Sequence, residues 1–337
     1  MSINIFMEQF VPKHLKHQYR LYDRNPKTGI GHSCNFPSRV LTVDTKGYCF
    51  LCKCDGWLPV SVGHIMDFDS LEAIWQNDIA RQLQKDLAEK KFTYCSVDSC
   101  NIKKSNIHED IHFISLNFDD SCNLACPTCR KSKINITTGP EYETRLSWAN
   151  HLVKLLSKFE QPCNINMSGN GDPFASLIYR QLIMNVSPKH NHKYHIMTNG
   201  LLLKKLLLQT KIYENIVNFD ISIDAGDKNT YEKVRRGGQW ETLIENLDFL
   251  KSLNREWTVN LNMVVHVENF NSIPNFCNLV DRYGWQGRLS KLENWNTFTE
   301  KEWLFQNVLD SAHPAYPRLL QMLAQAKKPN IFVGNLH

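Results

Sequence analysis

From residue 111 onward, short apolar runs alternate with longer stretches whose apolar residues recur at helical spacing. The first run, 111–118, is rich in β-branched and aromatic residues and ends at three polar residues, which is typical of a β-strand. Further strands are predicted at 164–168, 194–198, 217–223, 257–265 and 288–290, and helices at 141–160, 176–184, 240–253 and 274–283, with a Leu-rich helix beginning at Leu201. Repeated strand–helix units predict a parallel sheet with right-handed crossovers. Six such units predict an α/β fold, an open partial (β/α)6 TIM barrel.

The chain before residue 110 has a different pattern. Val40–Val43 and Tyr48–Cys52 are predicted to form a hairpin whose turn uses Gly47 at positive φ. An amphipathic helix is predicted from Ser70, a suitable N-cap, to Glu89. We therefore expect three parts: a small cysteine-rich α+β domain over 1–109, the partial barrel over 110–295, and a C-terminal helical segment over 296–337 that packs on the barrel.

Composition adds few constraints. The 337 residues are 42% hydrophobic and 22% charged, which is ordinary for a soluble globular protein. The net charge of +5 comes without any long Lys/Arg block, so no nucleic-acid partner is expected. No run approaches the roughly 18–20 apolar residues of a membrane span, and the first ten residues lack a signal-peptide pattern. A cytoplasmic protein without a membrane partner is expected.

Eleven cysteines in a reducing compartment argue for metal binding rather than disulfides. Cys122, Cys126 and Cys129 follow the first predicted barrel strand at C-x3-C-x2-C spacing. Three thiolates on one loop can hold three corners of an iron–sulfur cluster, which normally has four protein ligands, so one iron would stay open. The alternative is a three-cysteine zinc site that a distant ligand completes.

Polar groups also stand where the predicted strands end, which is the end that carries the chemistry in barrels. The candidates are Ser168, Gly169, Asn170, Gly171 and Asp172 after the second strand, Thr198 and Asn199 after the third, Ser222 and Asp224 on the fourth, Arg235 in the following segment, and Asn262 on the fifth. Period-two alternation directs Ser222 and Asp224 to one face. Simpler interpretations are a β-to-α turn for Thr198-Asn199, a solvated helix arginine for Arg235 and a strand-edge amide for Asn262.

The C-x3-C-x2-C loop after a strand resembles the signature of the radical S-adenosylmethionine (SAM) superfamily. The resemblance implies that Cys122, Cys126 and Cys129 bind a [4Fe–4S] cluster whose open iron chelates SAM. It implies reductive cleavage of SAM to a 5′-deoxyadenosyl radical that abstracts hydrogen from a substrate. The Gly-Asn-Gly-Asp segment resembles the Gly-Gly-Glu motif that holds the SAM amino group, with Asp172 where a Glu is usual. Thr128 departs from many relatives, which have an aromatic residue there against the adenine.

The early region resembles the SPASM/twitch extension of that superfamily. The resemblance rests on Cys34, on Gly47-x4-Cys52, on Gly63-x-Ile65 and on the helix start Leu71-x-x-Ile74-Trp75. It implies an auxiliary [4Fe–4S] cluster, and six early cysteines suffice for one. The implied ligands are Cys34, Cys52, Cys95 and Cys100, with Cys54 as a close substitute. The extension here precedes the barrel and lacks the full seven-cysteine set, and a structural zinc ribbon is the alternative.

The resemblance also bears on substrate and partners. SPASM relatives mostly modify ribosomal peptides, so a peptide or protein substrate leads, and a sugar or an amino acid is the alternative. Such enzymes need an electron donor such as flavodoxin or ferredoxin. The hypothesis from a different functional class is a non-enzymatic zinc-binding interaction protein.

Overall fold

The computed structural model describes residues 9–16, 34–52, 58–92, 94–95, 111–167, 169–294, 297–334 and 336. Three of the predicted site residues, Cys54, Cys100 and Ser168, lie outside these ranges. Tertiary contacts divide the chain into two compact units. Unit 1 comprises Met1–Asp120, Thr137–Asn170 and Ile178–Tyr194, and unit 2 comprises Ser121–Ile136, Gly171–Leu177 and His195–His337. Within the described ranges, no helix combines the length and apolar character needed to cross a bilayer.

Unit 1 contains the cysteine-rich region and the first two strands of the predicted barrel. Its strands are β1 (Val40–Val43), β2 (Tyr48–Phe50), β3 (Ser61–His64), β4 (His112–Leu116) and β5 (Cys163–Met167), and its helices are α3 (Leu71–Gln76), α4 (Asp78–Ala88), α5 (Gly139–Lys158) and most of α6 (Leu177–Asn185). The strand order in this unit is β5-β4-β1-β2-β3. The first residues of β6 (His192–Thr198) also belong to this unit, next to β5.

A parallel pairing joins the cysteine-rich region to the barrel strands of unit 1. Strand β1 pairs in parallel with β4, with Val40 opposite Phe113 and Val43 opposite Leu116. Beyond the paired residues, the N–H of Asn117 donates to the carbonyl of Val43 at 2.8 Å. Strands β1, β2 and β3 then continue the sheet as an antiparallel meander.

The hairpin and helix of the early region follow their sequence signals, with one exception. Gly47 turns the hairpin at φ 77°, and a Cβ there would meet His64 Nε2 at 2.2 Å, so only glycine suits the position. The Ser70 hydroxyl caps α3 by accepting from the Ala73 N–H. The single predicted helix is divided at Asn77, whose extended backbone ends α3 while its side chain caps α4. Helical spacing alone does not reveal such a break, because the apolar positions continue through it.

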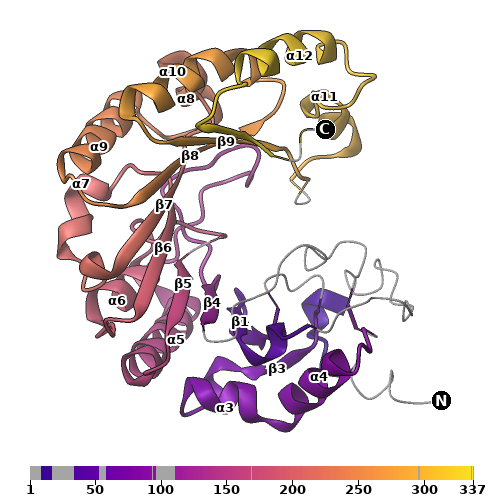
Figure 1. Ribbon diagram of the computed structural model, residues 1–337, viewed down its shortest axis with the longest axis vertical. Helices are drawn as coiled ribbons and strands as arrows, with labels where there is room; N and C mark the ends of the chain where they lie inside the picture. The colour runs from indigo at the N-terminus through magenta and orange to yellow at the C-terminus, as the bar shows by residue number, and fades with distance from the viewer. Residues whose placement is uncertain are drawn as a thin grey trace. The chain divides into compact units, whose positions relative to one another are not determined.

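Unit 2 contains the later strands and helices. These are the last residues of β6, then β7 (Ile216–Ser222), β8 (Thr258–Val265), β9 (Gln286–Lys291) and β10 (Ile331–Val333), with α7 (Leu203–Leu206), α8 (Lys228–Val234), α9 (Trp240–Ser252), α10 (Ile273–Tyr283), α11 (Glu300–Gln306) and α12 (Tyr316–Gln325). The strand order is β10-β9-β8-β7-β6, and the β7–β8, β8–β9 and β9–β10 pairs are parallel. Helices α7 to α10 lie along one side of strands β7 to β9 (Figure 1).

The two faces of these strands differ sharply. Along β8 every second residue is buried, beginning with Val259 and Leu261, while the polar residues between them keep partial exposure. The buried side packs on the helices: a Cβ on Gly287 of β9 would come within about 3 Å of Val280 and Phe276 of α10. The opposite side of the strands is polar.

The α/β fold predicted from the sequence is confirmed. Strands β4 to β9 are the six predicted strands, and helices occupy every connection between them. Among the described strands and α-helices, β3, α8 and β10 were not predicted, because they are short and short elements carry little periodic signal.

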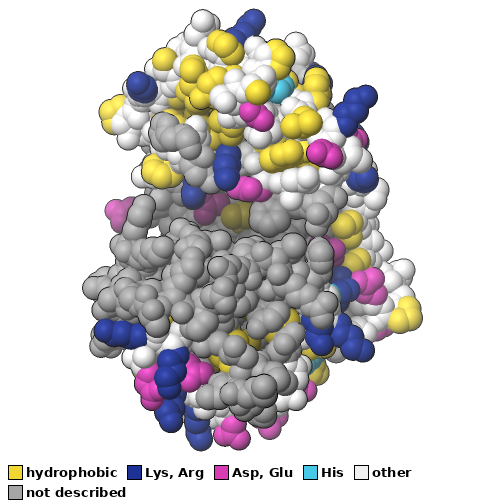
Figure 2. Space-filling model, turned by 90° about the vertical axis from the view of Figure 1, so that its right-hand side faces the viewer, with side chains coloured by type: hydrophobic (Ala, Val, Ile, Leu, Met, Phe, Trp, Pro, Cys, Tyr) yellow, Lys and Arg dark blue, Asp and Glu magenta, His cyan; other side chains and the backbone are white. Residues whose placement is uncertain are grey.

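The C-terminal elements leave apolar surface exposed. Strand β10 pairs with β9, and α12 packs against α10. Figure 2 shows hydrophobic side chains gathered at the top of the face that carries α11 and α12. The exposed large apolar residues of these elements are Leu304, Phe305, Leu320 and Phe332.

Candidate metal and cofactor site

The loop that carries Cys122, Cys126 and Cys129 is fixed by backbone hydrogen bonds within unit 2. The N–H of Cys122 donates to the Ile134 carbonyl at 2.8 Å, and that of Cys129 to the Cys126 carbonyl at 2.9 Å. The Ala125 N–H donates to the Arg236 carbonyl at 3.0 Å, which ties the loop to the segment after α8. These hydrogen bonds define the path of the loop within unit 2.

Each of the three sulfurs has an N–H donor nearby. The Leu124 N–H lies 3.4 Å from Cys122 Sγ, the Arg235 guanidinium 3.7 Å from Cys126 Sγ, and the Arg130 guanidinium 3.3 Å from Cys129 Sγ. Such donors stabilise negative charge on sulfur, which is what metal ligation by thiolates requires. Among the described residues, no three Cys, His, Asp or Glu side chains are arranged around a common point as metal ligands are.

Burial and nearby carboxylates act against ionisation of two of these thiols. Burial raises the pKa of Cys122 to about 11, and the charge of Asp172 adds to the rise. Burial also raises the pKa of Cys126, although Arg235 lowers it in opposition. Because a metal binds the thiolate, binding of a metal to these cysteines would release protons.

Asp172 connects three loops of unit 2. Its buried carboxylate accepts from the Phe174 and Ala175 N–H groups through Oδ1, each at 3.0 Å. Through Oδ2 it accepts from the Thr198 hydroxyl and the Asn199 N–H, each at 2.8 Å. Its own N–H donates to the Ser121 carbonyl at 2.9 Å, directly before the cysteine loop. These four hydrogen bonds satisfy the carboxylate, which thereby holds the strand-end loops together.

Asn199 contacts the cysteine loop itself. Its side-chain amide donates to Asn123 Oδ1 at 2.8 Å and lies 3.7 Å from Cys122 Sγ, while its Oδ1 accepts from the Leu201 N–H. The sequence predicted Thr198 and Asn199 either as cofactor contacts or as a β-to-α turn. Their hydrogen bonds go to Asp172, to the turn and to the cysteine loop.

Asp224 lies just beyond the end of β7 in the left-handed region, with φ 55°. The alternation expected to direct Ser222 and Asp224 to one face therefore ends at Ser222. The Asp224 carboxylate accepts from the Val264 N–H at 2.7 Å and pairs with Arg235 at 2.9 Å. Arg235 is thus a buried partner of Asp224 and of Cys126, and the interpretation as a solvated helix arginine is wrong.

Three buried polar atoms around this ion pair have no hydrogen-bond partner among the described residues. They are Nε of Arg235, the Tyr231 hydroxyl and Nε2 of His266. Burial lowers the pKa of His266, whose Nδ1 lies 3.1 Å from Gln306 Oε1. Buried polar atoms are rarely left unpaired, so a polar ligand has suitable groups to bind here.

Ser222 and Asn262 stand opposite each other in the β7–β8 register. The Asn262 carbonyl accepts from the N–H groups of Ile223 and Asp224, which fixes the turn after β7. Its side-chain amide lies 3.5 Å from Asp220 Oδ1. The predicted cofactor residues of unit 2 thus lie on strands β6, β7 and β8 and on the segments that follow β5, β6 and β7.

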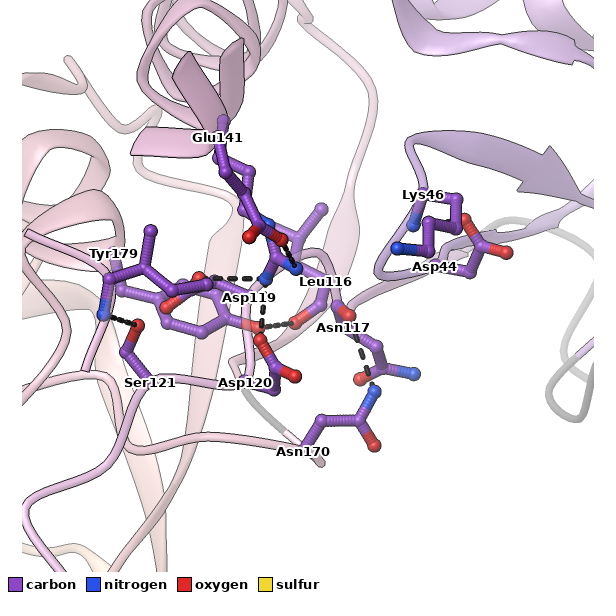
Figure 3. A network of polar contacts seen from close by, with 12 residues as sticks. Asp44, Lys46, Leu116, Asn117, Asp119, Asp120, Ser121, Glu141, Asn170 and Tyr179 are labelled. Atoms are coloured by element: carbon purple, nitrogen blue, oxygen red, sulfur yellow. Dashed lines mark hydrogen bonds and ion pairs between the residues drawn. The ribbon is translucent and has the colours of Figure 1, made fainter. Parts of the chain in front are cut away.

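In unit 1, the end of β4 is held by an ion cluster that includes the buried Asp119 (Figure 3). Arg145 of α5 contacts Asp119 at 2.9 Å, Asp120 at 2.6 Å and Glu141 at 2.6 Å, and the Asp119 side chain is fully buried. Beside them the Asn170 side chain donates to the Asn117 carbonyl at 3.3 Å, and Gly169 approaches the Asn117 side chain closely.

The early cysteines divide by environment within unit 1. Cys34 and Cys52 are buried and Cys95 is partly exposed, while Cys54 and Cys100 lie outside the described residues. The Thr42 hydroxyl donates to the Cys52 carbonyl at 2.6 Å. Burial, followed by the charges of Asp44 and Asp67, raises the pKa of Cys49 well above its usual value, as expected of a packed thiol.

Sequence reasoning missed His266, Asp220, Asn260 and Arg288. The last three lie on the polar side of β7, β8 and β9. A signal existed: parallel strands covered on both faces are apolar throughout, whereas these strands place polar residues at every second position. His266 had no such signal, because it stands alone after β8.

Comparison with known proteins gives two family matches. Residues 116–280 match the radical SAM superfamily, and residues 34–101 match the SPASM iron–sulfur cluster-binding domain. A comparison with curated proteins returned no match.

Solved structures with a similar backbone include three proteins of low identity. SuiB of Streptococcus suis bound to precursor peptide SuiA is 15% identical, with 80% of this chain and 56% of that chain covered and a TM-score of 0.46. The anSMEcpe protein with bound AdoMet is 16% identical, with 66% and 64% covered and a TM-score of 0.41. TYW1 with a lysine-pyruvate adduct is 18% identical, with 61% and 70% covered and a TM-score of 0.40. The chain thus spans less than two thirds of the first two.

Proposed function

This chain belongs to the radical SAM superfamily and carries a SPASM iron–sulfur region, and we propose on that basis that it modifies a peptide or protein substrate. It is an enzyme whose cofactors are a [4Fe–4S] cluster, SAM and an auxiliary iron–sulfur cluster. Held by Cys122, Cys126 and Cys129, the cluster would supply the electron for reductive cleavage of SAM, and the radical chemistry that follows would remove hydrogen from the substrate. The observation that carries the assignment of residues is the cysteine loop, in which every sulfur has an N–H donor.

Cys122, Cys126 and Cys129 would hold the SAM-binding cluster. Three thiols with N–H donors at 3.3–3.7 Å suit thiolate–iron ligation, because hydrogen bonds to the sulfurs stabilise a negatively charged cluster. Three protein ligands leave one iron free for SAM. The donor chemistry of this loop therefore suits the cluster, although its three sulfurs are not gathered around a common point in the described structure.

The polar atoms around Arg235 would bind the methionyl end of SAM. Arg235 Nε and the Tyr231 hydroxyl are buried donors without a partner among the described residues, and a carboxylate accepts from both. Ser222 and Asn262 would face the ribose. Asp172, Thr198 and Asn199 would act by positioning, since their bonds fix the loops. Gly169, Asn170 and Gly171, with Ser168, would bring backbone groups to the SAM amine.

The auxiliary cluster would use Cys34, Cys52, Cys95 and Cys100, with Cys54 as the substitute. We also propose that the domain boundaries lie between residues 109 and 110 and between residues 295 and 296. A flavodoxin or a ferredoxin would supply the electron. A peptide or protein is the favoured substrate because SPASM relatives mostly modify peptides; a sugar or an amino acid is the alternative.

Anaerobic purification followed by iron counting tests the ligand assignments. The wild type is expected to be brown and to hold about eight irons, and the triple variant Cys122→Ala, Cys126→Ala, Cys129→Ala about four. With dithionite and SAM the wild type should release 5′-deoxyadenosine, and Cys126→Ala should release none. The control is Cys163→Ala, which removes a buried thiol at the start of β5. Colourless protein with stoichiometric zinc would overturn the assignment.

The substrate class needs a separate measurement. Candidate peptides labelled with deuterium are added to reduced enzyme and SAM, and 5′-deoxyadenosine is analysed by mass spectrometry. Deuterium in the 5′-deoxyadenosine from a peptide supports the proposal. Transfer from a labelled sugar or amino acid, with none from peptides, favours the small-molecule alternative.

A further inference from the structure

The polar side of strands β7, β8 and β9 forms two lateral rows. Asp220 stands opposite Asn260, which stands opposite Gln286. One step further along the strands, Ser222, Asn262 and Arg288 form the second row. A polar side in a parallel sheet indicates a cavity that holds water or a ligand, because the strands of fully covered parallel sheets are apolar.

A pocket of about 550 Å³ opens on this side of unit 2. Its lining includes Asp220, Asn260, Gln286, Arg288, Asn330 and Phe332. The volume lies in the range of ligand sites, and polar groups from three neighbouring strands, β7, β8 and β9, converge on it.

The carboxylate of Asp220 has only neutral hydrogen-bond donors as side-chain partners among the described residues. It accepts from the side-chain amides of Asn218 at 2.8 Å and Asn260 at 3.0 Å. These neutral donors orient the carboxylate without neutralising it. Among the described residues, no Lys, Arg or His nitrogen lies within 4.0 Å of it. A cationic group in the pocket would therefore find an oriented, uncompensated acceptor.

Arg288 supplies the opposite charge at the other end. Its guanidinium lies over the Phe332 ring, 5.6 Å from the centroid, which holds the planar group in place. No carboxylate forms an ion pair with it in the described part of the chain. Arg288 and Asp220 are two strands and two residues apart, so their Cα atoms are separated by about 12 Å.

The pocket adjoins the residues proposed to face the ribose. Asp220 precedes Ser222 by two residues on the same side of β7, a rise of about 6.6 Å. A group bound at Asp220 therefore lies close to where the radical would form.

We propose that this pocket is a substrate subsite for a peptide segment that carries a basic and an acidic side chain. Asp220 binds the ammonium or guanidinium group, Arg288 binds the carboxylate, and Asn260 and Gln286 bond the polar groups between them. The proposal rests on the proposed function, whose favoured substrate is a peptide. An extended chain rises about 3.3 Å per residue, so residues three apart span about 10 Å and match the two charges.

Ligand-observed NMR on purified holoenzyme without SAM tests the subsite with the acetylated, amidated tetrapeptide KGGE and its counterparts QGGE and KGGQ. The wild type is expected to bind KGGE about tenfold more tightly than either counterpart. Asp220→Asn should abolish the preference for KGGE over QGGE, and Arg288→Gln the preference for KGGE over KGGQ. Each variant should leave the other preference in place.

Matched controls separate a local site from net charge. Glu256→Gln and Arg318→Gln remove the same charges from exposed positions and should retain both preferences. Equal binding of the three peptides by the wild type overturns the proposal, even if no variant folds. Loss of both preferences in the control variants also overturns it, because binding would then depend on net charge. Failure of the wild type to cleave SAM would instead overturn the proposed function and leave the pocket measurement intact.

Discussion

The guanidinium of Arg235 joins the carboxylate of Asp224, at 2.9 Å, to the sulfur of Cys126, at 3.7 Å. Asp224 is itself held by the Val264 N–H after an unusual left-handed turn. The ion pair is almost fully buried, with side chains 11% and 4% exposed. The strand-end loops thus fix a cation beside the middle cysteine.

Arg235→Gln is expected to make the reduction potential of the SAM-binding cluster more negative. Removing a positive donor beside Cys126 disfavours the additional electron, and Asp224 is left uncompensated. A shift on the order of 50 mV is expected, close to a tenfold change in the equilibrium constant. Redox titration followed by EPR spectroscopy measures it. Arg235→Lys should give a smaller shift because the charge remains.

The exposed neighbour Arg236 provides the control for this substitution. Arg236→Gln removes the same charge from the same segment without a side-chain contact to a cysteine sulfur. Equal potentials for Arg235→Gln and wild type would show that the contact with Cys126 does not tune the cluster.

Asp172→Asn is expected to loosen the loops that Asp172 joins. An amide nitrogen would replace one carboxylate oxygen and would face N–H or O–H donors, which leaves buried donors unpaired. The expected loss of stability is about 2 kcal/mol in urea unfolding. Hydrogen exchange at the backbone N–H of Asn199 should accelerate, since this N–H donates to the Asp172 carboxylate. Thr198→Val, which removes only one of the four bonds, should cost about 1 kcal/mol; an equal cost for both would contradict the shared role.

Arg145→Met is expected to destabilise the chain by about 3 kcal/mol. The substitution leaves Asp119 buried without its cation, and an unpaired buried charge is costly. Urea unfolding measures the loss. The control is Arg255→Met, which breaks the exposed pair with Glu214 and should cost about 0.5 kcal/mol. Similar losses for the two variants would mean that the Arg145 cluster contributes no more than a surface pair.

His112 should make unit 1 sensitive to acid. Burial, followed by the charge of Arg39, lowers the pKa of His112 to about 4, whereas an unfolded histidine titrates near 6.5. Below pH 6.5 the unfolded chain binds the proton first, so stability falls as the pH drops from 6.5 toward 4. The loss between pH 7.5 and pH 5 is about 2 kcal/mol.

His112→Phe tests this pH dependence, because the ring contacts with Trp75 and Phe159 can persist without a titrating group. The free energy of unfolding in urea should differ between pH 7.5 and pH 5 by about 2 kcal/mol less in this variant than in the wild type. His190→Gln, at an exposed position, should behave like the wild type. An unchanged difference in His112→Phe would assign the acid sensitivity to other groups.

Much of the fold was predictable, because its strands and helices are long enough to show periodicity. The six barrel strands appear within a few residues of their predicted places. The break at Asn77 and the left-handed turn at Asp224 were not predictable, since each depends on backbone geometry that neighbouring side chains do not encode.

The candidate site was predictable in its residue types and only partly in its contacts. Spacing identifies Cys122, Cys126 and Cys129. It cannot reveal that Asp172 accepts from loops far apart in sequence, or that Arg235 is buried beside Cys126. Hydrogen bonds between distant segments depend on tertiary packing. Asp220 and Arg288 are far apart in sequence, and only the strand register shows that they lie on the same side of neighbouring strands.

The parallel pairing of β1 with β4 limits how this protein can be divided or engineered. In sequence the cysteine-rich region looks like a separable domain that precedes the barrel. In unit 1 it covers the edge of β4, and excising it would expose unpaired backbone groups that promote aggregation. During synthesis β1 emerges from the ribosome well before its partner and must wait for it. Truncation and domain-swap designs therefore need to replace the β1 edge as well as the cysteines.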